Sequence, residues 1–279
     1  MQRFLFLIII QSLCAGSAAA INLYDASLGS VPSLQDWVSF NEPGSTITST
    51  GTAASINTSS SFDLRAGVSS ELTFGGLFEH PLMPVLDRHE GFYLEFSLQV
   101  LSETHNLNRD DNNDGLLDRA GFSVITLSQE LLGVELAFFE DKIWAYEDGM
   151  DNAADQFTQA ENIAFDTTVL TDYRLEGASD GYALFANDIN ILSGDWRNYN
   201  PSGVSALTNP YDNPSFLFLG DNTTSASAEV LIGDIDVVTG PFVAQPSPVP
   251  VPVPLPAPAL MLFAGSILMG FFRHSEKMQ

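Results

Sequence analysis

Short segments of alternating apolar and polar residues constrain the fold of this chain more than any other feature. Within 91–100, GFYLEFSLQV, every second side chain is apolar: Phe92, Leu94, Phe96, Leu98 and Val100. A period of two is typical of a β-strand that buries one face. The central part of the chain contains no segment with the period of a long helix. The sequence therefore predicts an all-β domain.

Further segments with the composition of strands are separated by Gly, Asn and Asp. They cover 71–74, 121–127, 134–138, 142–146, 173–177, 182–186, 189–192, 216–220 and 228–237. Asn187 and Asp188, between two of these segments, favour a tight hairpin turn. Many short strands separated by turns indicate a β-sandwich.

The first 20 residues form a predicted secretory signal peptide. Arg3 precedes the apolar run 4–10, and three alanines supply small residues for cleavage after Ala20. The only cysteine, Cys14, lies in this segment, and Leu13 stands where a lipoprotein, the alternative, needs a small residue. The expected mature domain, 21–240, therefore uses neither a disulfide nor a thiolate.

The composition changes abruptly after residue 240. Alternating prolines predict an extended linker over 241–252. Residues 259–272 carry no charge, and basic residues follow at 273 and 277. A membrane is spanned by about 20 apolar residues, a length that is reached when the proline-rich start from 253 is included. We expect a transmembrane helix over about 257–273, with its basic end in the cytoplasm.

The segment Val253-Pro254-Leu255-Pro256-Ala257 is followed by an apolar stretch and a basic end within 253–279. This order resembles the PEP-CTERM sorting signal in its VPLPA-type variant. The resemblance implies that an exosortase, a membrane-embedded protease-transpeptidase, recognises and removes the tail. It also implies transfer from the inner membrane of a Gram-negative bacterium to the cell surface or an extracellular polysaccharide matrix. Leu255 stands where the family usually has Glu, and Glu276 weakens the basic end, so retention in the membrane stays open.

The order of the last strands also resembles a known architecture. A hairpin over 182–192 is followed by the residues Phe218-Leu219-Gly220-Asp221 and a closing strand, 228–237. This arrangement is similar to the concanavalin A-like, or laminin-G-like, jelly roll. It also looks like the exported choice-of-anchor domains that occur with this sorting tail, whose opening is similar to residues 23–37. The resemblance implies a jelly-roll β-sandwich over 21–240.

The predicted domain is strongly acidic. Residues 21–245 carry 34 of the 35 Asp and Glu but only seven of the ten Lys and Arg. Because phosphate contacts come from Lys and Arg, this balance excludes a nucleic-acid-binding protein. An acidic surface favours solubility outside the cell and the binding of divalent cations.

The segment 110–118, DDNNDGLLD, has the spacing of a calcium loop. Oxygen side chains stand at positions 1, 3, 5 and 9, with a glycine at position 6, and such a spacing surrounds one ion with oxygen ligands. The predicted Ca²⁺ ligands are Asp110, Asn112, Asp114, the carbonyl of Leu116, and Asp118. The loop resembles those of EF-hand, dockerin and thrombospondin type-3 repeats, but Gly121 stands where they place a bidentate Glu. The alternative is an ordinary acidic turn.

Familiar catalytic motifs are missing from this sequence. It has no Glu-x-Asp-x-Glu strand, no Gly-x-Ser-x-Gly elbow and no His-Glu-x-x-His pair. We therefore expect a non-enzymatic surface or matrix protein stabilised by calcium, rather than a glycoside hydrolase. The alternative is a calcium-dependent, lectin-like module that binds an extracellular polysaccharide. Its predicted stacking residues are Trp196, Tyr199 and Tyr211.

Overall fold

The computed structural model describes residues 20–71, 78–200 and 209–240. The chain divides into two units, 1–243 and 244–279, and the second lies outside the described residues. Several predictions also lie outside them: the signal peptide up to residue 19, most of strand 71–74, the linker 241–252, and the tail 253–279 with its transmembrane helix. Within the described ranges, no helix is long and apolar enough to cross a membrane.

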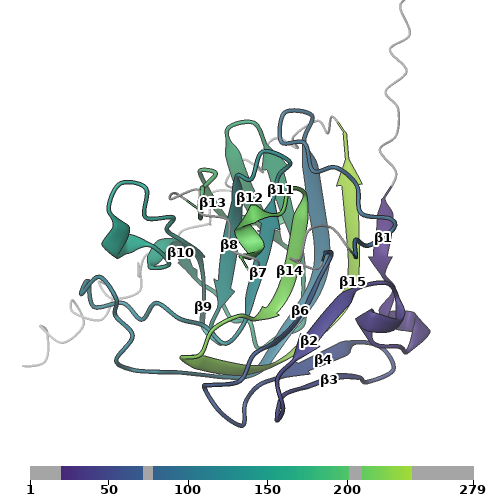
Figure 1. Ribbon diagram of the computed structural model, residues 1–279, viewed down its shortest axis with the longest axis horizontal. Coiled ribbons are helices and arrows are strands. Elements are labelled where there is room, and N and C mark those ends of the chain that lie inside the picture. The colour runs from purple at the N-terminus through teal and green to yellow at the C-terminus, as the bar shows by residue number, and fades with distance from the viewer. Residues whose placement is uncertain (1–19, 72–77, 201–208, 241–279) are drawn as a thin grey trace, which may run out of the picture. The chain divides into compact units, whose positions relative to one another are not determined.

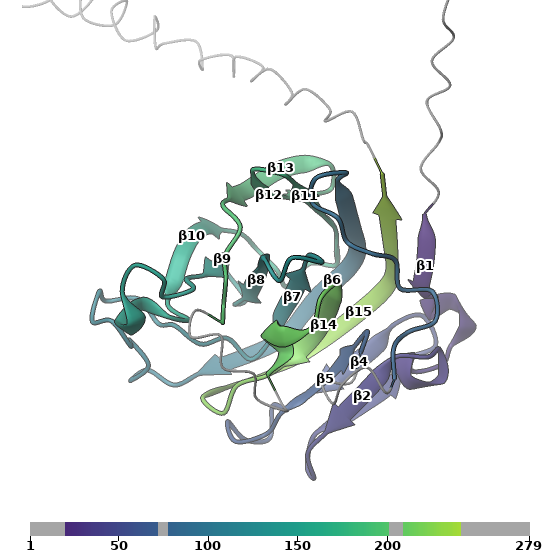
Figure 2. The same cartoon turned by 45° about the horizontal axis from the view of Figure 1, so that its top comes forward.

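Two antiparallel β-sheets lie face to face in the described domain (Figures 1 and 2). Sheet A has eight strands in this part of the chain, in the order β13-β12-β11-β6-β15-β4-β3, with β1 paired to β15. Its strands are β1 (Ile21–Tyr24), β3 (Thr46–Ser49), β4 (Ala54–Asn57), β6 (Phe92–His105), β11 (Thr171–Ala178), β12 (Gly181–Ala186), β13 (Ile189–Gly194) and β15 (Ala226–Thr239).

Sheet B has seven strands among the described residues, in the order β10-β9-β8-β7-β14-β5-β2. They are β2 (Val38–Asn41), β5 (Ala66–Ser69), β7 (Ser123–Leu127), β8 (Gly133–Phe138), β9 (Lys142–Tyr146), β10 (Gln159–Ala164) and β14 (Phe216–Asp221). The helical elements described are the 3-10 turns η1 (Ala26–Leu28), η2 (Pro32–Leu34), η3 (Ala153–Asp155) and η4 (Pro210–Asp212). The prediction of an all-β domain is confirmed.

The predicted strands from residue 91 onward form, and several extend beyond their predicted bounds. Residues 92–100 begin β6, and the alternating apolar side chains of this segment all face the core between the sheets. Asn187 and Asp188 adopt φ angles of 48° and 64°, as the two-residue hairpin turn between β12 and β13 requires. Glu71, from the predicted strand 71–74, forms an isolated bridge with Glu79. The N-terminal strands β1 to β5 were not predicted.

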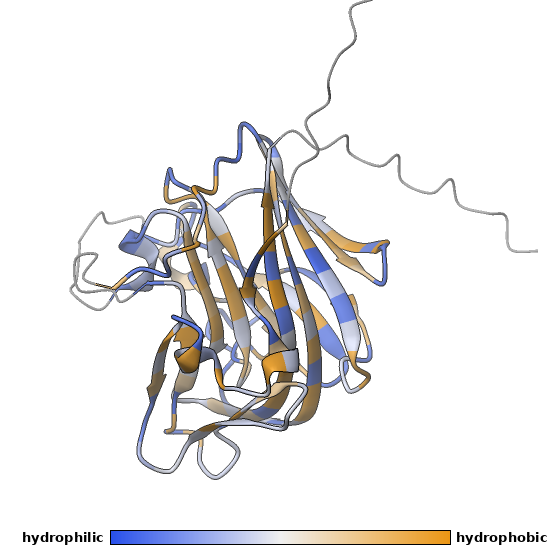
Figure 3. Ribbon diagram, turned by 90° about the vertical axis from the view of Figure 1, so that its right-hand side faces the viewer, coloured by the Kyte–Doolittle hydropathy of each residue, from blue (hydrophilic) through white to orange (hydrophobic). Residues whose placement is uncertain are grey.

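The core between the sheets is made by the inward faces of both layers. Hydrophobic and hydrophilic residues alternate along several strands (Figure 3). Leu94 and Phe96 of β6 meet residues such as Val124 of β7 and Leu136 of β8 in one buried cluster. Full burial of a side chain of this kind contributes about 1.5–3 kcal/mol, so this cluster is the main source of stability.

The central strands of sheet B are buried on their outer face as well, which the alternation did not predict. Every residue of β7, β8 and β14 is buried. Side chains on the outer face form a second apolar cluster, which includes Ile125, Trp144, Tyr146, Phe216 and Phe218. Strands covered on both faces carry nearly continuous apolar runs. A surface of this kind can hold a deep pocket.

The first and last strands of the domain are neighbours. Ile21 of β1 pairs with Val237 of β15 in an antiparallel ladder, and Asn22 pairs with Asp236. The two strands run side by side in Figures 1 and 2. The start and the end of the domain are therefore joined by backbone hydrogen bonds.

Candidate functional site

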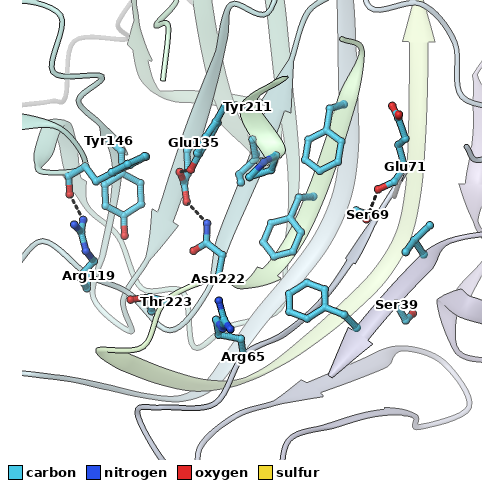
Figure 4. A pocket seen from close by; sticks show the side chains of 17 residues that line it. Ser39, Arg65, Ser69, Glu71, Arg119, Glu135, Tyr146, Tyr211, Asn222 and Thr223 are labelled. Carbon is cyan, nitrogen blue, oxygen red and sulfur yellow. Dashed lines mark hydrogen bonds between the residues drawn. The ribbon is translucent and has the colours of Figure 1, made fainter. Parts of the chain in front are cut away.

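A pocket with a volume of about 550 Å³ lies on the outer face of sheet B (Figure 4). Side chains from β2, β5, β7, β8, β9 and β14 form most of its wall. The connecting segments add Arg119, Phe157, Asn222 and Thr223, and η4 adds Tyr211. Residues from across the sequence therefore meet at one place on the sheet.

The floor of the pocket is one row of side chains across five strands. Val38 pairs with Ser69, Ser69 with Phe218, Phe218 with Ile125, and Ile125 with Glu135. Residues directly opposite each other on antiparallel strands project from the same face of a sheet. The register of the sheet therefore aligns an aromatic ring and a carboxyl group along the same row.

An aromatic surface begins at the middle of this row, at Phe218. The ring of Phe218 lies against Gly67, where an added Cβ would be only 2.5 Å from the ring. Phe40 stacks on Phe218 with the ring centroids 6.0 Å apart and the planes 17° apart. Phe40 is 39% exposed and Phe218 only 4%. The stacked pair therefore reaches from the solvent into the pocket.

Glu135 provides a polar group at the β8 end of the row, and it is only 2% exposed. Its carboxyl group accepts hydrogen bonds from the Tyr211 hydroxyl and from Nδ2 of Asn222, the latter at 3.0 Å (Figure 4). Burial raises the pKa of the Glu135 carboxyl, and the bonds from Tyr211 and Asn222 oppose this shift only in part. The group is thus held in a fixed orientation, and its pKa lies above the ordinary value of a glutamate.

Aromatic rings also surround Glu135 on the side of β9. The ring of Phe157 lies 5.5 Å from Tyr211 and 6.3 Å from Tyr146. The guanidinium of Arg119 lies over two of these rings, 5.9 Å from Tyr146 and 5.7 Å from Phe157. Arg119 also donates hydrogen bonds to the carbonyl oxygens of Phe157 and Asp118. These contacts hold the aromatic wall in place.

The three predicted stacking residues occupy different places. Tyr211 lines the pocket, although it contributes a hydroxyl group to Glu135 rather than an exposed ring. Tyr199 is 3% exposed and lies beneath the wall, where its hydroxyl accepts from the Glu135 amide at 3.0 Å. Trp196 packs outside the pocket against Phe92 and donates to the carbonyl of Ala178. Only Tyr211 therefore belongs to the candidate site.

The predicted calcium loop forms a compact turn, and its Asp111 is ion-paired with Arg119 at 2.9 Å. The two carboxylate oxygens of Asp110 accept from the amides of Asp114 and Gly115, both at 3.0 Å. Asn112 Oδ1 also accepts from the Asp114 amide, at 3.2 Å, and the Leu116 amide donates to Asp114 Oδ1 at 2.7 Å. Four of the five predicted ligand positions therefore lie in one hydrogen-bonded turn.

Asp118 has a different role in this loop. It is fully buried, and its oxygens accept from the amides of Asp111 at 2.7 Å and Gln159 at 3.1 Å. It thus anchors the loop to the start of β10. In the ranges that the structure describes, no group of three or more His, Cys, Asp or Glu side chains is arranged to hold a metal ion. Calcium binding stays a prediction.

No protein-family model matches this sequence, and neither does any curated protein. Among solved structures, the chain is similar to a conserved carbohydrate esterase of the Shiga toxin-encoding bacteriophage phi24B. The TM-score is 0.51 at 14% identity, covering 80% of this chain and 100% of the other. At this identity the match shows a shared fold alone.

Two weaker similarities have TM-scores under 0.5, and nothing about function follows from them. One is to a Crh5 transglycosylase, with a TM-score of 0.45 and 10% identity over 82% of this chain and 86% of the other. The second is to a Bacillus subtilis protein of unknown function with a galectin-like fold. Its TM-score is 0.44 at 11% identity over 80% of this chain and 97% of the other.

The prediction that this chain is not an enzyme is contradicted by these comparisons. A structure that shares its fold is described as a carbohydrate esterase. The prediction relied on the absence of three sequence motifs. Each motif belongs to particular families, whereas catalytic groups on a sheet can come from strands far apart in the sequence.

Glu135 is the pocket residue that the sequence motifs missed. It is the only charged residue in β8, whose other residues are apolar or glycine. A carboxyl group in a strand that is buried on both faces costs free energy unless it has partners. A single charged residue in an otherwise apolar strand was therefore a signal in the sequence. The two hydrogen-bond partners of Glu135, however, lie 76 and 87 residues further along the chain.

Proposed function

We propose that this protein is an exported carbohydrate-binding β-sandwich of the concanavalin A-like, jelly-roll type, with the pocket on sheet B as its binding site. One observation carries the proposal: the same pocket holds the aromatic pair Phe40 and Phe218 and the hydrogen-bonded group of Glu135, Tyr211 and Asn222. Sugars present apolar faces and hydroxyl groups. Pockets for small molecules combine apolar walls with a few convergent polar groups in this way.

The size and setting of the pocket support the same proposal. Its volume of about 550 Å³ lies within the usual range for small-molecule sites. The adjacency of β1 and β15 and the two stacked antiparallel sheets agree with a jelly roll. The bacteriophage protein with the shared fold is described as acting on carbohydrate, which agrees with a carbohydrate ligand here.

An oligosaccharide array probed with the full chain, with Asn222→Ala and with Asn162→Ala tests this proposal. Asn222 donates to Glu135 in the pocket, whereas Asn162 is exposed on β10. We expect the full chain and the Asn162 variant to bind the same oligosaccharides, and the Asn222 variant to lose that binding. Silence of the full chain across neutral, acidic and amino-sugar oligosaccharides would contradict the proposal, as would unchanged binding by the Asn222 variant.

Hydrolysis of the bound carbohydrate is a second candidate function. It is favoured by the carboxyl group of Glu135, which lines the pocket and whose pKa is raised by burial, the direction of shift that a general acid needs. The test is release of reducing ends or acetate from bound oligosaccharides. We expect turnover by the full chain and none by Glu135→Gln. Binding without any turnover would reject hydrolysis and leave carbohydrate binding as the only proposed function of the pocket.

We also propose that residues 253–279 act as a PEP-CTERM-like sorting signal handled by an exosortase-like protease. The VPLPA segment, the uncharged stretch 259–272 and the basic end support this. In a host with such a protease, the full chain should appear at the cell surface as a shortened product. Deletion of the protease gene should leave the longer form in the inner membrane. An identical distribution in both strains would argue against sorting.

We further propose that the loop 110–118 binds calcium and stabilises the domain. Asp110, Asn112 and Asp114 bring side-chain oxygens into one turn, and Leu116 could add its carbonyl. Calcium prefers oxygen ligands of these kinds.

A further inference from the structure

The charged groups in the pocket wall differ in whether they have partners. Arg65 is paired with Glu42 at 2.6 Å, and Arg119 is paired with Asp111 at 2.9 Å. No ion pair joins Glu135 to a basic side chain in the part of the chain that the structure describes. Its hydrogen bonds come from neutral donors, the Tyr211 hydroxyl and the Asn222 amide. The Glu135 carboxyl therefore has no basic side chain in direct contact with it, although the charge of Arg119 acts on it from a distance and lowers its pKa.

The aromatic rings of the pocket have the chemistry that attracts a cation. Tyr146, Phe157, Tyr211, Phe216 and Phe218 all line the pocket. The faces of aromatic rings attract ammonium and guanidinium groups within about 6 Å of the ring centre. Arg119 already lies over two of these rings from one side of the pocket. A buried carboxyl group among aromatic rings is a combination that suits an organic ammonium ion.

We infer that the pocket selects carbohydrate that carries a free amine, with the ammonium group of an amino sugar beside Glu135 and the sugar ring on Phe218. This inference rests on the proposed function of carbohydrate binding. The ammonium group can donate hydrogen bonds to both carboxylate oxygens of Glu135. The row that aligns Phe218, Ile125 and Glu135 places the stacking surface and the counter-ion on one face of the sheet.

Two electrostatic properties of the protein favour the same ligand class. The chain carries a formal net charge of −25, which attracts a cationic polysaccharide from a distance. Burial raises the pKa of the Glu135 carboxyl, because desolvation disfavours its charged form. A bound ammonium group favours the carboxylate and makes the pair mutually stabilising. A neutral sugar gains neither effect.

Calorimetry with three tetrasaccharides of matched length tests the inference on the full chain. The ligands are the β-1,4-linked glucosamine tetramer, its fully N-acetylated form, and a neutral glucose tetramer, all at one pH below 6. N-acetylation removes the positive charge and leaves the sugar ring in place. We expect the glucosamine tetramer to bind at least about tenfold more tightly than the other two. Glu135→Gln should abolish this preference, and Glu90→Gln, a change on the exposed surface, should keep it.

The possible outcomes separate the inference from the proposed function. Equal affinity for all three tetramers would overturn the selection of amino sugars, and a preference that survives in Glu135→Gln would overturn the placement of the ammonium group beside Glu135. Both results would leave carbohydrate binding intact. No binding of any tetramer by the full chain, together with a silent oligosaccharide array, would overturn both. The comparison between ligands needs no variant, so the test still holds if Glu135→Gln fails to fold.

Discussion

The hydroxyl of Thr58 donates a hydrogen bond to Oδ2 of Asp221 at 2.6 Å, and this bond joins the two sheets of the domain. Thr58 follows β4 in sheet A, and Asp221 ends β14 in sheet B. Asp221 is 1% exposed, and burial raises its pKa to about 8. Burial likewise raises the pKa of Glu103, on β6, to about 8, and the charge of Asp221 adds to this shift.

These two carboxyl groups predict that stability falls as the pH rises. In the folded domain both keep their protons up to about pH 8, whereas in the unfolded chain they lose them near pH 4. The unfolded state therefore binds fewer protons between about pH 4 and pH 8, and the free energy of unfolding decreases through that interval. Urea unfolding at pH 5 and at pH 8 measures the difference.

Urea unfolding of two variants at the same two pH values identifies the group that causes the loss of stability. Asp221→Asn should reduce the loss of stability between pH 5 and pH 8, because the amide carries no proton that titrates there. Asp63→Asn, at an exposed position, should leave the loss unchanged. An equal loss in the Asp221 variant and in the unmodified chain would show that Asp221 is not responsible.

Replacement of Phe218 by alanine should weaken carbohydrate binding without unfolding the domain. The change removes the ring at the centre of the floor and its stack with Phe40. Loss of a central aromatic contact typically costs about 2 kcal/mol, which is roughly thirtyfold in affinity. Phe185→Ala is the control, since Phe185 lies under Arg174 on β12 of sheet A. Calorimetry that gave equal affinities for the two variants would exclude Phe218 from the site.

Replacement of Gly67 by alanine should displace the ring of Phe218. The added Cβ of Gly67→Ala would lie 2.5 Å from the Phe218 ring and 3.1 Å from the carbonyl oxygen of Leu219. Overpacking of this kind costs about 1–3 kcal/mol of stability. In a Phe218→Ala background the clash with the ring disappears, so the second change should cost less there. Additive costs in this double-mutant cycle would contradict the predicted contact.

Titration of the full chain with calcium should give a heat signal that the double variant Asp110→Ala/Asp114→Ala lacks. The two aspartates contribute side-chain oxygens to the turn that Asn112 shares. Because no bidentate Glu completes the loop, we expect a dissociation constant of about 10⁻⁴–10⁻³ M, the range of extracellular calcium modules. Equal heats for the two proteins would reject calcium binding at this loop.

The sequence pattern predicts the strands of this fold better than their partners. The alternation of β6 and the apolar runs of β7 and β8 are strong local signals. The strands β3 and β5, TITS and AGVS, are short and polar or small, and they form because β4 and β14 pair with them. Contacts between distant parts of the chain determine whether such segments form strands, and the local sequence pattern does not predict those contacts.

The pocket was less predictable for the same reason. Tyr211 was singled out from the sequence as an aromatic residue in a loop, but its hydroxyl bond to Glu135 depends on the register of β8 against β7 and β14. Tyr199 and Trp196 looked equally suited, yet they are engaged by backbone groups elsewhere. Local composition finds candidate side chains, whereas sheet register determines which of them meet.

The pairing of Ile21 with Val237 holds the first and last strands of the domain next to each other by backbone hydrogen bonds. A chain in which a linker connects the end of β15 to the start of β1, and which is opened at the Asn187-Asp188 turn, would keep every strand next to its present neighbours. Such a circular permutant should fold to the same two sheets, because the strand pairing and packing that stabilise the domain do not depend on where the chain begins and ends. Carbohydrate binding by the permutant would then depend only on sheet B, which the new ends do not interrupt.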